Sequence, residues 1–380
     1  MGFIPHNSHD QAIENMTGVK ILILAPEAHG GFGGISTYNR DLVNACCELP
    51  WVHEVRLVLR HIRFVPVGLP NKVSLAATAE NGITSFARVV LAQAFERFDL
   101  VLCTHLYLLP FAKIVTMRFG APVVGAIYGV EAWQPTKRLF VDRLVRHCAG
   151  FISISEFTSR RFREWSGYPE RKIGLLPNAI NLHSYKLAAK PDYLIKRYGL
   201  IGKRVILTLG RLDSRERQKG IDELIELMPQ LIACSSDLVY LIAGDGDDRQ
   251  RLEKKVASLG LTDCVRFSGK ISEEEKVDHY CLCDVYSMAG RQEGFGFVFL
   301  EAMATGAPVV ASLLDGSRDA VLNGKIGELA NPDEPETIKR AILDALEKPR
   351  EIPSLLEQFS YPKFVEKLDQ ILRRLVITKH

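Results

Sequence analysis

The chain of 380 residues lacks the features that define several large protein classes. Its eight cysteines form no Cys-x-x-Cys pair and no His/Cys spacing typical of zinc, so neither a structural metal nor a disulfide framework is indicated. Scattered thiols of this kind are typical of a reducing compartment and of small buried side chains rather than of redox chemistry. The formal net charge is only +3, which gives no basis for bulk affinity for nucleic acid.

Long apolar runs are also missing. No run approaches the roughly 20 apolar residues that span a bilayer, and the first, Ile21–Ala25, is too short for the core of a signal peptide. We therefore expect a cytoplasmic protein. Repeats of solenoid length and low-complexity tracts are absent. A chain of this length with 47% hydrophobic residues has enough apolar side chains for two domains.

Strand and helix patterns alternate along the first half of the chain. Val19–Ala25 is an unbroken apolar run typical of a buried parallel strand, and a glycine-rich loop and a helical pattern over Ile35–Leu49 follow it. Further strands are predicted at Val55–Leu59, Leu100–Thr104, Val123–Tyr128 and Gly150–Ser155. Strands separated by helices favour a doubly wound parallel sheet.

The same pattern restarts in the second half. A helix is predicted over Ile221–Ala233, among strands at Arg204–Gly210, Val239–Gly244, Val265–Phe267, Val285–Tyr286 and Val309–Ala311. The sequence thus predicts two Rossmann-like domains, residues 1–182 and 183–363, with a hinge between Pro177 and Pro191. In such sheets ligands bind at the carboxyl ends of the strands, so we expect a cleft that both domains line.

A basic loop follows the first strand of the second half. It reads Gly-Arg-Leu-Asp-Ser-Arg-Glu-Arg-Gln-Lys-Gly and begins at Gly210. Arg211 offers a planar fork for phosphate oxygens, and Lys219 offers a point charge just before a helix. Arg215 and Arg217 are typical of a solvated basic loop. Arg211 and Lys219 are therefore the candidate diphosphate ligands.

Two glutamates, Glu293 and Glu301, lie eight residues apart in Glu-Gly-Phe-Gly-Phe-Val-Phe-Leu-Glu. The glycines let the backbone approach a ligand, and the start of the helix offers free N–H groups that suit a diphosphate. An acid/base pair for glycoside hydrolysis is an alternative, but Glu301 lies inside the predicted helix while Glu293 precedes it.

The remaining glycine-rich and acidic motifs are less specific. Gly30-Gly-Phe-Gly-Gly is a phosphate-loop candidate, although no Gly-Lys-Ser/Thr follows and the GxGxxG spacing is absent. Asp245-Gly-Asp247 has the spacing of a metal site but directly follows a strand, as a turn would.

These motifs together resemble the retaining GT-B glycosyltransferases, the group that contains bacterial mannosyltransferases and glycogen synthase. The resemblance covers nearly the whole chain and is closest to an α-mannosyltransferase of xanthan-type exopolysaccharide assembly. It implies the GT-B fold, with an N-terminal acceptor domain, a C-terminal nucleotide-sugar domain, and a C-terminal helix, 364–380, that packs back onto the first domain. The amphipathic stretch Phe364–Val376 fits that helix.

The resemblance also implies roles for the candidate residues. Arg211 and Lys219 hold the diphosphate, Glu293 orients the hexose and Glu301 binds the ribose. The implied donor-binding residues are Gly33, Gly34, Ile271, Phe295, Gly296, Phe297, Val298 and Glu301. No metal and no other cofactor is expected.

One implied catalytic position departs from the family pattern. Many members have a histidine where this chain has Tyr128, and a tyrosine is a poor base near pH 7. His105 is a substitute candidate. A retaining transfer needs neither if the leaving phosphate accepts the acceptor proton.

The implied substrates are GDP-mannose and a polyprenyl-diphosphate-linked oligosaccharide at the inner membrane face, with no nucleic acid partner. Basic residues recur in the first half, with Phe86, Phe95, Phe98 and Phe111 among them. This pattern fits a surface for anionic lipids or, alternatively, an ordinary solvated helix face. A UDP-sugar transferase, an epimerase and an inactive nucleotide-sugar-binding subunit stay open as alternatives.

Overall fold

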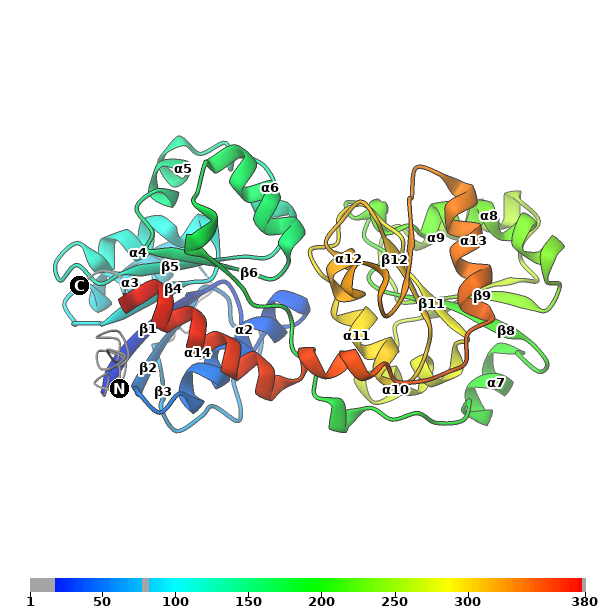
Figure 1. Ribbon diagram of the computed structural model, residues 1–380, viewed down its shortest axis with the longest axis horizontal. Helices are drawn as coiled ribbons and strands as arrows, with labels where there is room; N and C mark the ends of the chain where they lie inside the picture. Colours follow the sequence, from blue (N-terminus) through cyan, green and yellow to red (C-terminus); the bar gives the residue numbers. More distant parts are fainter. Residues whose placement is uncertain (1–17, 77–81, 378–380) are drawn as a thin grey trace, which may run out of the picture. The chain divides into compact units, whose positions relative to one another are not determined.

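The structure is a computed structural model that describes residues 18–76 and 82–377. The chain forms two compact units (Figure 1). Unit 1 comprises residues 1–179 and 361–380, and unit 2 comprises residues 180–360. The sequence places the same two boundaries at 182/183 and 363/364.

Unit 1 is built on a seven-stranded sheet in the order β3-β2-β1-β4-β5-β6-β7. Its strands are β1 (Val19–Ala25), β2 (Val52–Leu59), β3 (Val73–Leu75), β4 (Leu100–Cys103), β5 (Val123–Ile127), β6 (Gly150–Ser153) and β7 (Ile173–Leu175). Its helices are α2 (Gly34–Glu48), α3 (Ile83–Gln93), α4 (Leu109–Thr116), α5 (Leu139–Val145), α6 (Glu156–Ser166) and α14 (Tyr361–Ile377), with short 3-10 turns at Leu106–Leu108, Val130–Ala132 and Glu170–Lys172.

Unit 2 is built on a six-stranded sheet in the order β10-β9-β8-β11-β12-β13. Its strands are β8 (Arg204–Leu209), β9 (Leu238–Ala243), β10 (Val265–Gly269), β11 (Val285–Ser287), β12 (Val309–Ser312) and β13 (Glu328–Ala330). Its helices are α7 (Asp192–Tyr198), α8 (Ile221–Cys234), α9 (Arg249–Ser258), α10 (Glu273–Leu282), α11 (Phe297–Ala304), α12 (Ser317–Ala320) and α13 (Pro335–Leu346), and 3-10 turns lie at Leu182–Ser184, Arg217–Lys219, Leu322–Gly324 and Ser354–Phe359.

Every strand pair in both sheets is parallel. Each sheet runs outward from its first strand in one direction and then continues on that strand's other side, which is the doubly wound order. The prediction of two Rossmann-like units is confirmed. The edge strands β3, β7 and β13, of three residues each, were not predicted.

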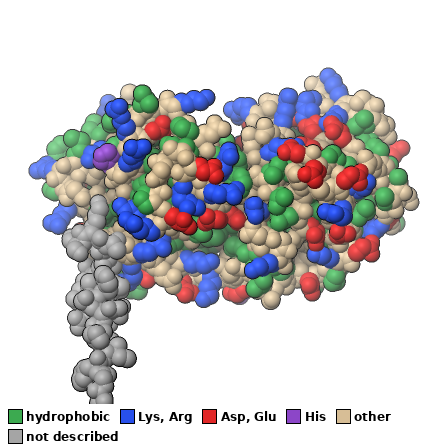
Figure 2. Space-filling model, turned by 45° about the horizontal axis from the view of Figure 1, so that its top comes forward, with side chains coloured by type: hydrophobic (Ala, Val, Ile, Leu, Met, Phe, Trp, Pro, Cys, Tyr) green, Lys and Arg blue, Asp and Glu red, His purple; other side chains and the backbone are tan. Residues whose placement is uncertain are grey.

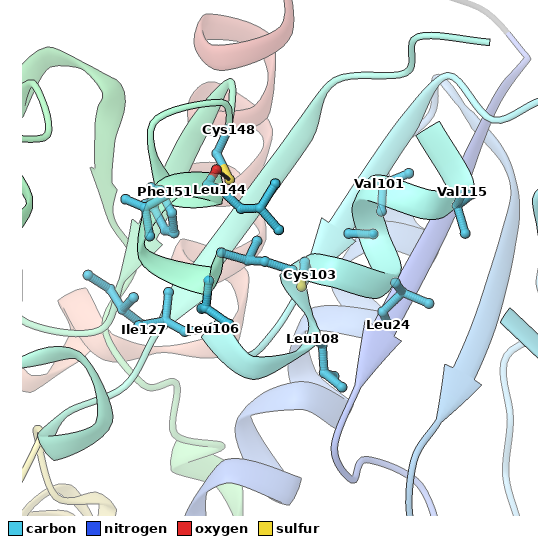
Figure 3. Packing of buried hydrophobic residues seen from close by; sticks show 14 of the residues in the cluster. Leu24, Val101, Cys103, Leu106, Leu108, Val115, Ile127, Leu144, Cys148 and Phe151 are labelled. Atoms are coloured by element: carbon cyan, nitrogen blue, oxygen red, sulfur yellow. Dashed lines mark hydrogen bonds between the residues drawn. The ribbon is translucent and has the colours of Figure 1, made fainter. Parts of the chain in front are cut away.

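The core of unit 1 lies between its sheet and the helices packed on it (Figure 3). Leu24, Val101, Ile127 and Phe151 come from four neighbouring strands, and Leu144 of α5 belongs to the same buried cluster. All eight cysteines are free thiols, and six of them are buried. Unit 2 has its own buried cluster around β8, β9 and α8.

Helix α14 returns to unit 1 and packs against α2. Its buried residues, Phe364, Leu368, Ile371, Leu372 and Leu375, follow the helical repeat. Two glycines of the sheet admit this helix. A Cβ at Gly150 would lie 2.6 Å from Leu375, and one at Gly174 would lie 2.5 Å from Ile371. The last helix is therefore part of the fold of unit 1.

We expect Leu372→Ala to lower the free energy of unfolding by about 2–5 kcal/mol, because the buried leucine leaves a cavity under α14. Leu139→Ala is the matched control, since Leu139 is 78% exposed and its loss should cost less than about 0.5 kcal/mol. Urea unfolding of both variants measures the difference, and equal midpoints would contradict the role given to α14.

Candidate functional site

The strand order of unit 2 reverses between β8 and β11. In open parallel sheets the chain leaves two such neighbouring strands in opposite directions, and the resulting crevice at their carboxyl ends is the usual ligand site. The loop after β8 carries Arg211 and Lys219, and the loop after β11 carries Glu293. The topology therefore brings the two strongest sequence motifs to one edge of one sheet.

The loops after β8 and β11 touch through their backbones. A Cβ at Gly220 would lie 2.5 Å from the carbonyl oxygen of Ala289, and a Cβ at Gly290 would lie 2.5 Å from that of Gln218. The amide of Arg291 donates a hydrogen bond of 2.8 Å to the same Gln218 oxygen. Only glycine allows this approach, which fixes Lys219 relative to the second loop.

Arg211 and Lys219 share one carboxylate. Nη2 of Arg211 lies 2.7 Å from Oε1 of Glu216, and Nζ of Lys219 lies 2.7 Å from Oε2 of the same side chain. The Arg211 side chain is 72% exposed and that of Lys219 22% exposed. Two cations thus converge on one small anion, with Arg211 free to move toward solvent.

The other arginines of this loop have different partners. Arg215 pairs with Asp213, and Arg217 pairs with the buried Asp248. These contacts agree with their interpretation as ordinary residues of a solvated loop.

Glu293 is held by the loop after β12. Its amide donates to Oδ2 of Asp315 (3.0 Å), and its carbonyl accepts from the amide of Gly316 (2.8 Å). A Cβ at Gly316 would lie 2.0 Å from the carbonyl oxygen of Gly294, so this contact also requires glycine. Asp315, itself fully buried, accepts two further bonds from Ser317.

Both carboxyl groups hold their protons more tightly than usual. Burial raises the pKa of Glu293, while the charge of Lys219 and the amides of Phe295 and Gly294 lower it in part. Burial also raises the pKa of Asp315 to about 7, against the hydrogen bonds from Ser317 and the Glu293 amide. Lys219 is thus near enough to Glu293 to act on its ionisation.

Glu301 lies on α11 and is almost fully buried. Its Oε1 accepts from the Tyr185 hydroxyl (3.1 Å) and from Nζ of Lys276 (2.7 Å), and its Oε2 accepts from the Tyr280 hydroxyl (2.7 Å). Burial lowers the pKa of Lys276, but Glu301 and Glu273 together raise it by more, so the net shift is upward. The carboxylate is therefore fixed in place, and among the described residues Oε2 has Tyr280 as its single partner.

The start of α11 presents its backbone rather than its aromatic side chains. Gly296 precedes the helix with φ +91°, and no side chain caps this end. Phe295 and Phe299 are fully buried, against Phe359 and Tyr286 respectively. Phe295 offers its amide rather than its ring, and this amide acts on Glu293. Donor binding by the backbone of Phe295, Gly296, Phe297 and Val298 stays a prediction.

Two weaker motifs lie on neighbouring strand ends. Gly269, just before Lys270 and Ile271, accepts a bond from the Gly244 amide (3.0 Å), so the loops after β9 and β10 adjoin. Asp247 accepts from Ser214, and Asp245 pairs with Arg249. Among the described residues no group of three His, Cys, Asp or Glu side chains is arranged to hold a metal ion.

The remaining candidates belong to unit 1. Gly33 precedes α2 with φ +89°, and Gly34 begins that helix. Tyr128 is 5% exposed, its hydroxyl donates to Oδ1 of Asn39 (2.7 Å), and burial raises its pKa. His105 accepts from the Tyr107 amide, and burial together with Arg60 lowers its pKa to about 4. Both side chains already have structural partners, and their approach to the residues of unit 2 stays a prediction.

Sequence reasoning missed several partners of the predicted residues. Glu216 lies within the basic loop, where an acid between two cations was a detectable signal. Asp315, Lys276, Tyr185 and Tyr280 carry no such signal, because they reach Glu293 and Glu301 only through the packing of the loops and helices.

Comparison with known proteins finds matches for both units. Residues 195–361 match the family described as Glycosyl transferases group 1, and residues 32–184 match Glycosyltransferase Family 4. These two segments correspond to unit 2 and unit 1.

Two curated relatives are moderately similar. A GDP-mannose-dependent alpha-(1-6)-phosphatidylinositol monomannoside mannosyltransferase of Mycolicibacterium smegmatis is 32% identical over 60% of this chain and 62% of its own length. A 2-deoxystreptamine glucosyltransferase of Streptomyces kanamyceticus is 29% identical over 84% of each chain. The chain spans about half to three fifths of the length of the mannosyltransferases that it matches.

Among solved structures, Anabaena Alr3699/HepE in complex with UDP and glucose superposes with a TM-score of 0.72 over 93% of this chain and 99% of its own, at 20% identity. That likeness establishes the fold. Both units are thus matched in order by glycosyltransferase families, and the whole chain has the two-domain fold of that solved glycosyltransferase-like structure.

Proposed function

We propose that this protein is a retaining, metal-independent glycosyltransferase that moves mannose from GDP-mannose to a polyprenyl-diphosphate-linked oligosaccharide in exopolysaccharide synthesis. The mannosyltransferase relative supports the donor. A UDP-hexose is the second candidate donor, because the glucosyltransferase relative aligns over more of this chain.

The observation that carries the proposal is the convergence of Arg211 and Lys219 on Glu216 at the switch point of the sheet. Carboxylate and phosphate oxygens accept the same charge-assisted hydrogen bonds. We infer that the donor diphosphate replaces the Glu216 carboxylate between the two cations. The exposed side chain of Arg211 allows this exchange without movement of the sheet.

The cations then act on the leaving group. When the bond between the anomeric carbon and the phosphate oxygen breaks, its electron pair stays on the nucleoside diphosphate, and Arg211 and Lys219 stabilise the new charge. The acceptor hydroxyl bonds to the anomeric carbon from the same face, and its proton passes to the departing phosphate oxygen. This sequence needs no protein base, which agrees with the structural partners of Tyr128 and His105.

Two glutamates position the donor in this mechanism. Glu293 orients the hexose from a loop that Asp315 and Gly316 hold in place. Glu301 accepts a ribose hydroxyl on Oε2, whose one partner in the described part of the chain is Tyr280, while Lys276 and Tyr185 hold Oε1. The amides at the start of α11 face the diphosphate.

We expect GDP-mannose to raise the melting temperature of the chain more than UDP-glucose does. A ligand at about 100 times its dissociation constant adds about 2.7 kcal/mol to the folded state, which is roughly 5–10 °C for a unit of this size. Differential scanning fluorimetry with each nucleotide-sugar measures this shift. A larger shift with UDP-glucose would move the assignment to the second donor, and no shift with either would remove the proposed site.

We expect Lys219→Ala to lower kcat by roughly 100- to 1,000-fold, because the leaving phosphate loses a fixed cation. Arg215→Ala is the control: it removes an arginine of the same loop whose partner is Asp213, and should leave kcat within about twofold. Release of GDP in the presence of a lipid-linked acceptor reports both rates. Equal rates in the two variants would refute the phosphate assignment.

We expect Asp315→Asn to change both turnover and the pH dependence of stability. Burial raises the pKa of Asp315 from 3.8 to about 7, so the folded chain binds its proton more tightly than the unfolded chain. The free energy of unfolding of the wild type therefore falls as pH rises from 3.8 to about 7. The variant should lose this part of the pH dependence. Because Glu293 loses a fixed partner, kcat should fall roughly 10- to 100-fold.

Urea unfolding at several pH values, together with GDP release, checks both effects. Asp344→Asn, at an exposed position of α13, is the control and should change neither. If the free energy of unfolding of Asp315→Asn depends on pH as that of the wild type does, the titration assigned to Asp315 is wrong.

A further inference from the structure

Helices α3, α4 and α5 of unit 1 carry an unusual distribution of charge. Residues 82–148 contain eight basic side chains, and all are exposed: Arg88, Arg97, Lys113, Arg118, Lys137, Arg138, Arg143 and Arg146. None of them forms an ion pair with a residue that the structure describes. The uncompensated positive charge of this segment therefore faces solvent.

The acidic residues of the same segment are already engaged. Glu96 pairs with Lys20 and Arg56, and Asp99 accepts from the Lys20 amide. Glu131 and Asp142 accept hydrogen bonds from neighbouring backbone and hydroxyl groups. None of the four is left to neutralise the exposed bases.

Exposed apolar side chains lie among these bases. On α3 and the turn after it, Arg88, Leu91 and Phe95 follow the helical repeat on the solvent side, and Phe95 is 73% exposed. Past the end of α4, Met117 is 72% exposed and Phe119 is also exposed. A solvated helix face would carry polar residues at these positions.

Helices α3 and α4 pack against each other, and Arg118 connects the exposed side chains beyond their ends. The guanidinium of Arg118 lies 5.2 Å from the ring centre of Phe119 and 5.9 Å from that of Phe95. The side chains of Arg88, Leu91, Phe95, Arg97, Lys113, Met117, Arg118 and Phe119 are here called the basic-apolar face. Basic and hydrophobic side chains also stand next to one another on the unit 1 side of Figure 2.

The structure corrects the phenylalanines that the sequence grouped here. Phe86 and Phe98 are buried, and Phe111 packs against the core cluster. Of these four side chains only Phe95 is exposed, and Leu91, Met117 and Phe119 take the place of the others. The reason is that the helical repeat turns Phe86 toward the sheet and Phe95 away from it.

We propose that the basic-apolar face docks on an anionic phospholipid bilayer. Unpaired Lys and Arg side chains are attracted to anionic headgroups, and apolar side chains between them insert into the interface. In the described ranges no helix has both the length and the apolar composition needed to cross a membrane. The inference deepens the proposed function, because docking here would hold the chain beside a lipid-linked acceptor.

The test is cosedimentation of the full chain with vesicles. Wild-type protein should pellet with vesicles of equimolar phosphatidylcholine and phosphatidylglycerol, far less with phosphatidylcholine alone, and less as salt screens the charges. Arg97→Glu with Arg118→Glu should weaken binding roughly tenfold or more. Phe95→Ser with Phe119→Ser should weaken it while leaving the salt dependence in place.

Matched controls change the same chemistry on unit 2. Lys203→Glu with Lys254→Glu reverses two exposed charges, and Ile201→Ser with Leu259→Ser removes two exposed apolar side chains. Both controls should bind vesicles as the wild type does. The proposal is overturned if wild-type protein stays in the supernatant, or if the controls lose as much binding as the variants of the face.

A second measurement separates this proposal from the proposed function. The thermal shift with GDP-mannose should be the same in the wild type and in all four double variants, because none of these residues contacts the donor site. Loss of vesicle binding with an intact shift supports the face. A missing shift in the wild type would count against the donor site alone.

Discussion

Backbone contact between the loops after β8 and β11 is the constraint on which the candidate site depends. The α-carbons of Gly220 and Gly290 each face a backbone carbonyl oxygen of the other loop at close range. The Arg291 amide adds a hydrogen bond between the two loops. The backbone of Lys219 is fixed by these contacts, and its ammonium group pairs with Glu216 within range of the charge of Glu293. The site is thus organised by the main chain, which moves less than long side chains do. Such prior organisation is what electrostatic stabilisation of a leaving group requires.

Two acidic side chains support this arrangement in different ways. Glu216 is exposed enough to leave, and it keeps Arg211 and Lys219 close together through charge. Asp315 is fully buried and fixes the backbone of Glu293 through a hydrogen bond, at the cost of a raised pKa. The first acid stands in for a ligand, whereas the second belongs to the framework. This difference explains why exchange at Glu216 need not disturb the position of Glu293.

The small net charge of the chain conceals a contrast between its two units. Around the candidate site of unit 2, Arg215, Arg217 and Arg251 are paired with aspartates. On α3 to α5 of unit 1, exposed bases lack such partners among the described residues, and Phe95 and Met117 lie beside them. Paired charges make a surface that water solvates well, while unpaired charges beside apolar groups favour an anionic interface.

The sequence by itself determined the two parallel sheets, because buried strands appear as short apolar runs and the helices between them show the helical repeat of apolar residues. It also determined that Arg211, Lys219 and Glu293 follow strand ends, where parallel topology gathers ligands. Only the tertiary structure decided what surrounds them. Asp315 reaches Glu293, and Lys276 reaches Glu301, across segments whose approach depends on loop and helix packing. The hydroxyl of Tyr128 bonds to Asn39, a partner that the sequence did not indicate. Local pattern fixes the strand on which a side chain lies, whereas its partners are fixed by contacts between residues distant in the chain.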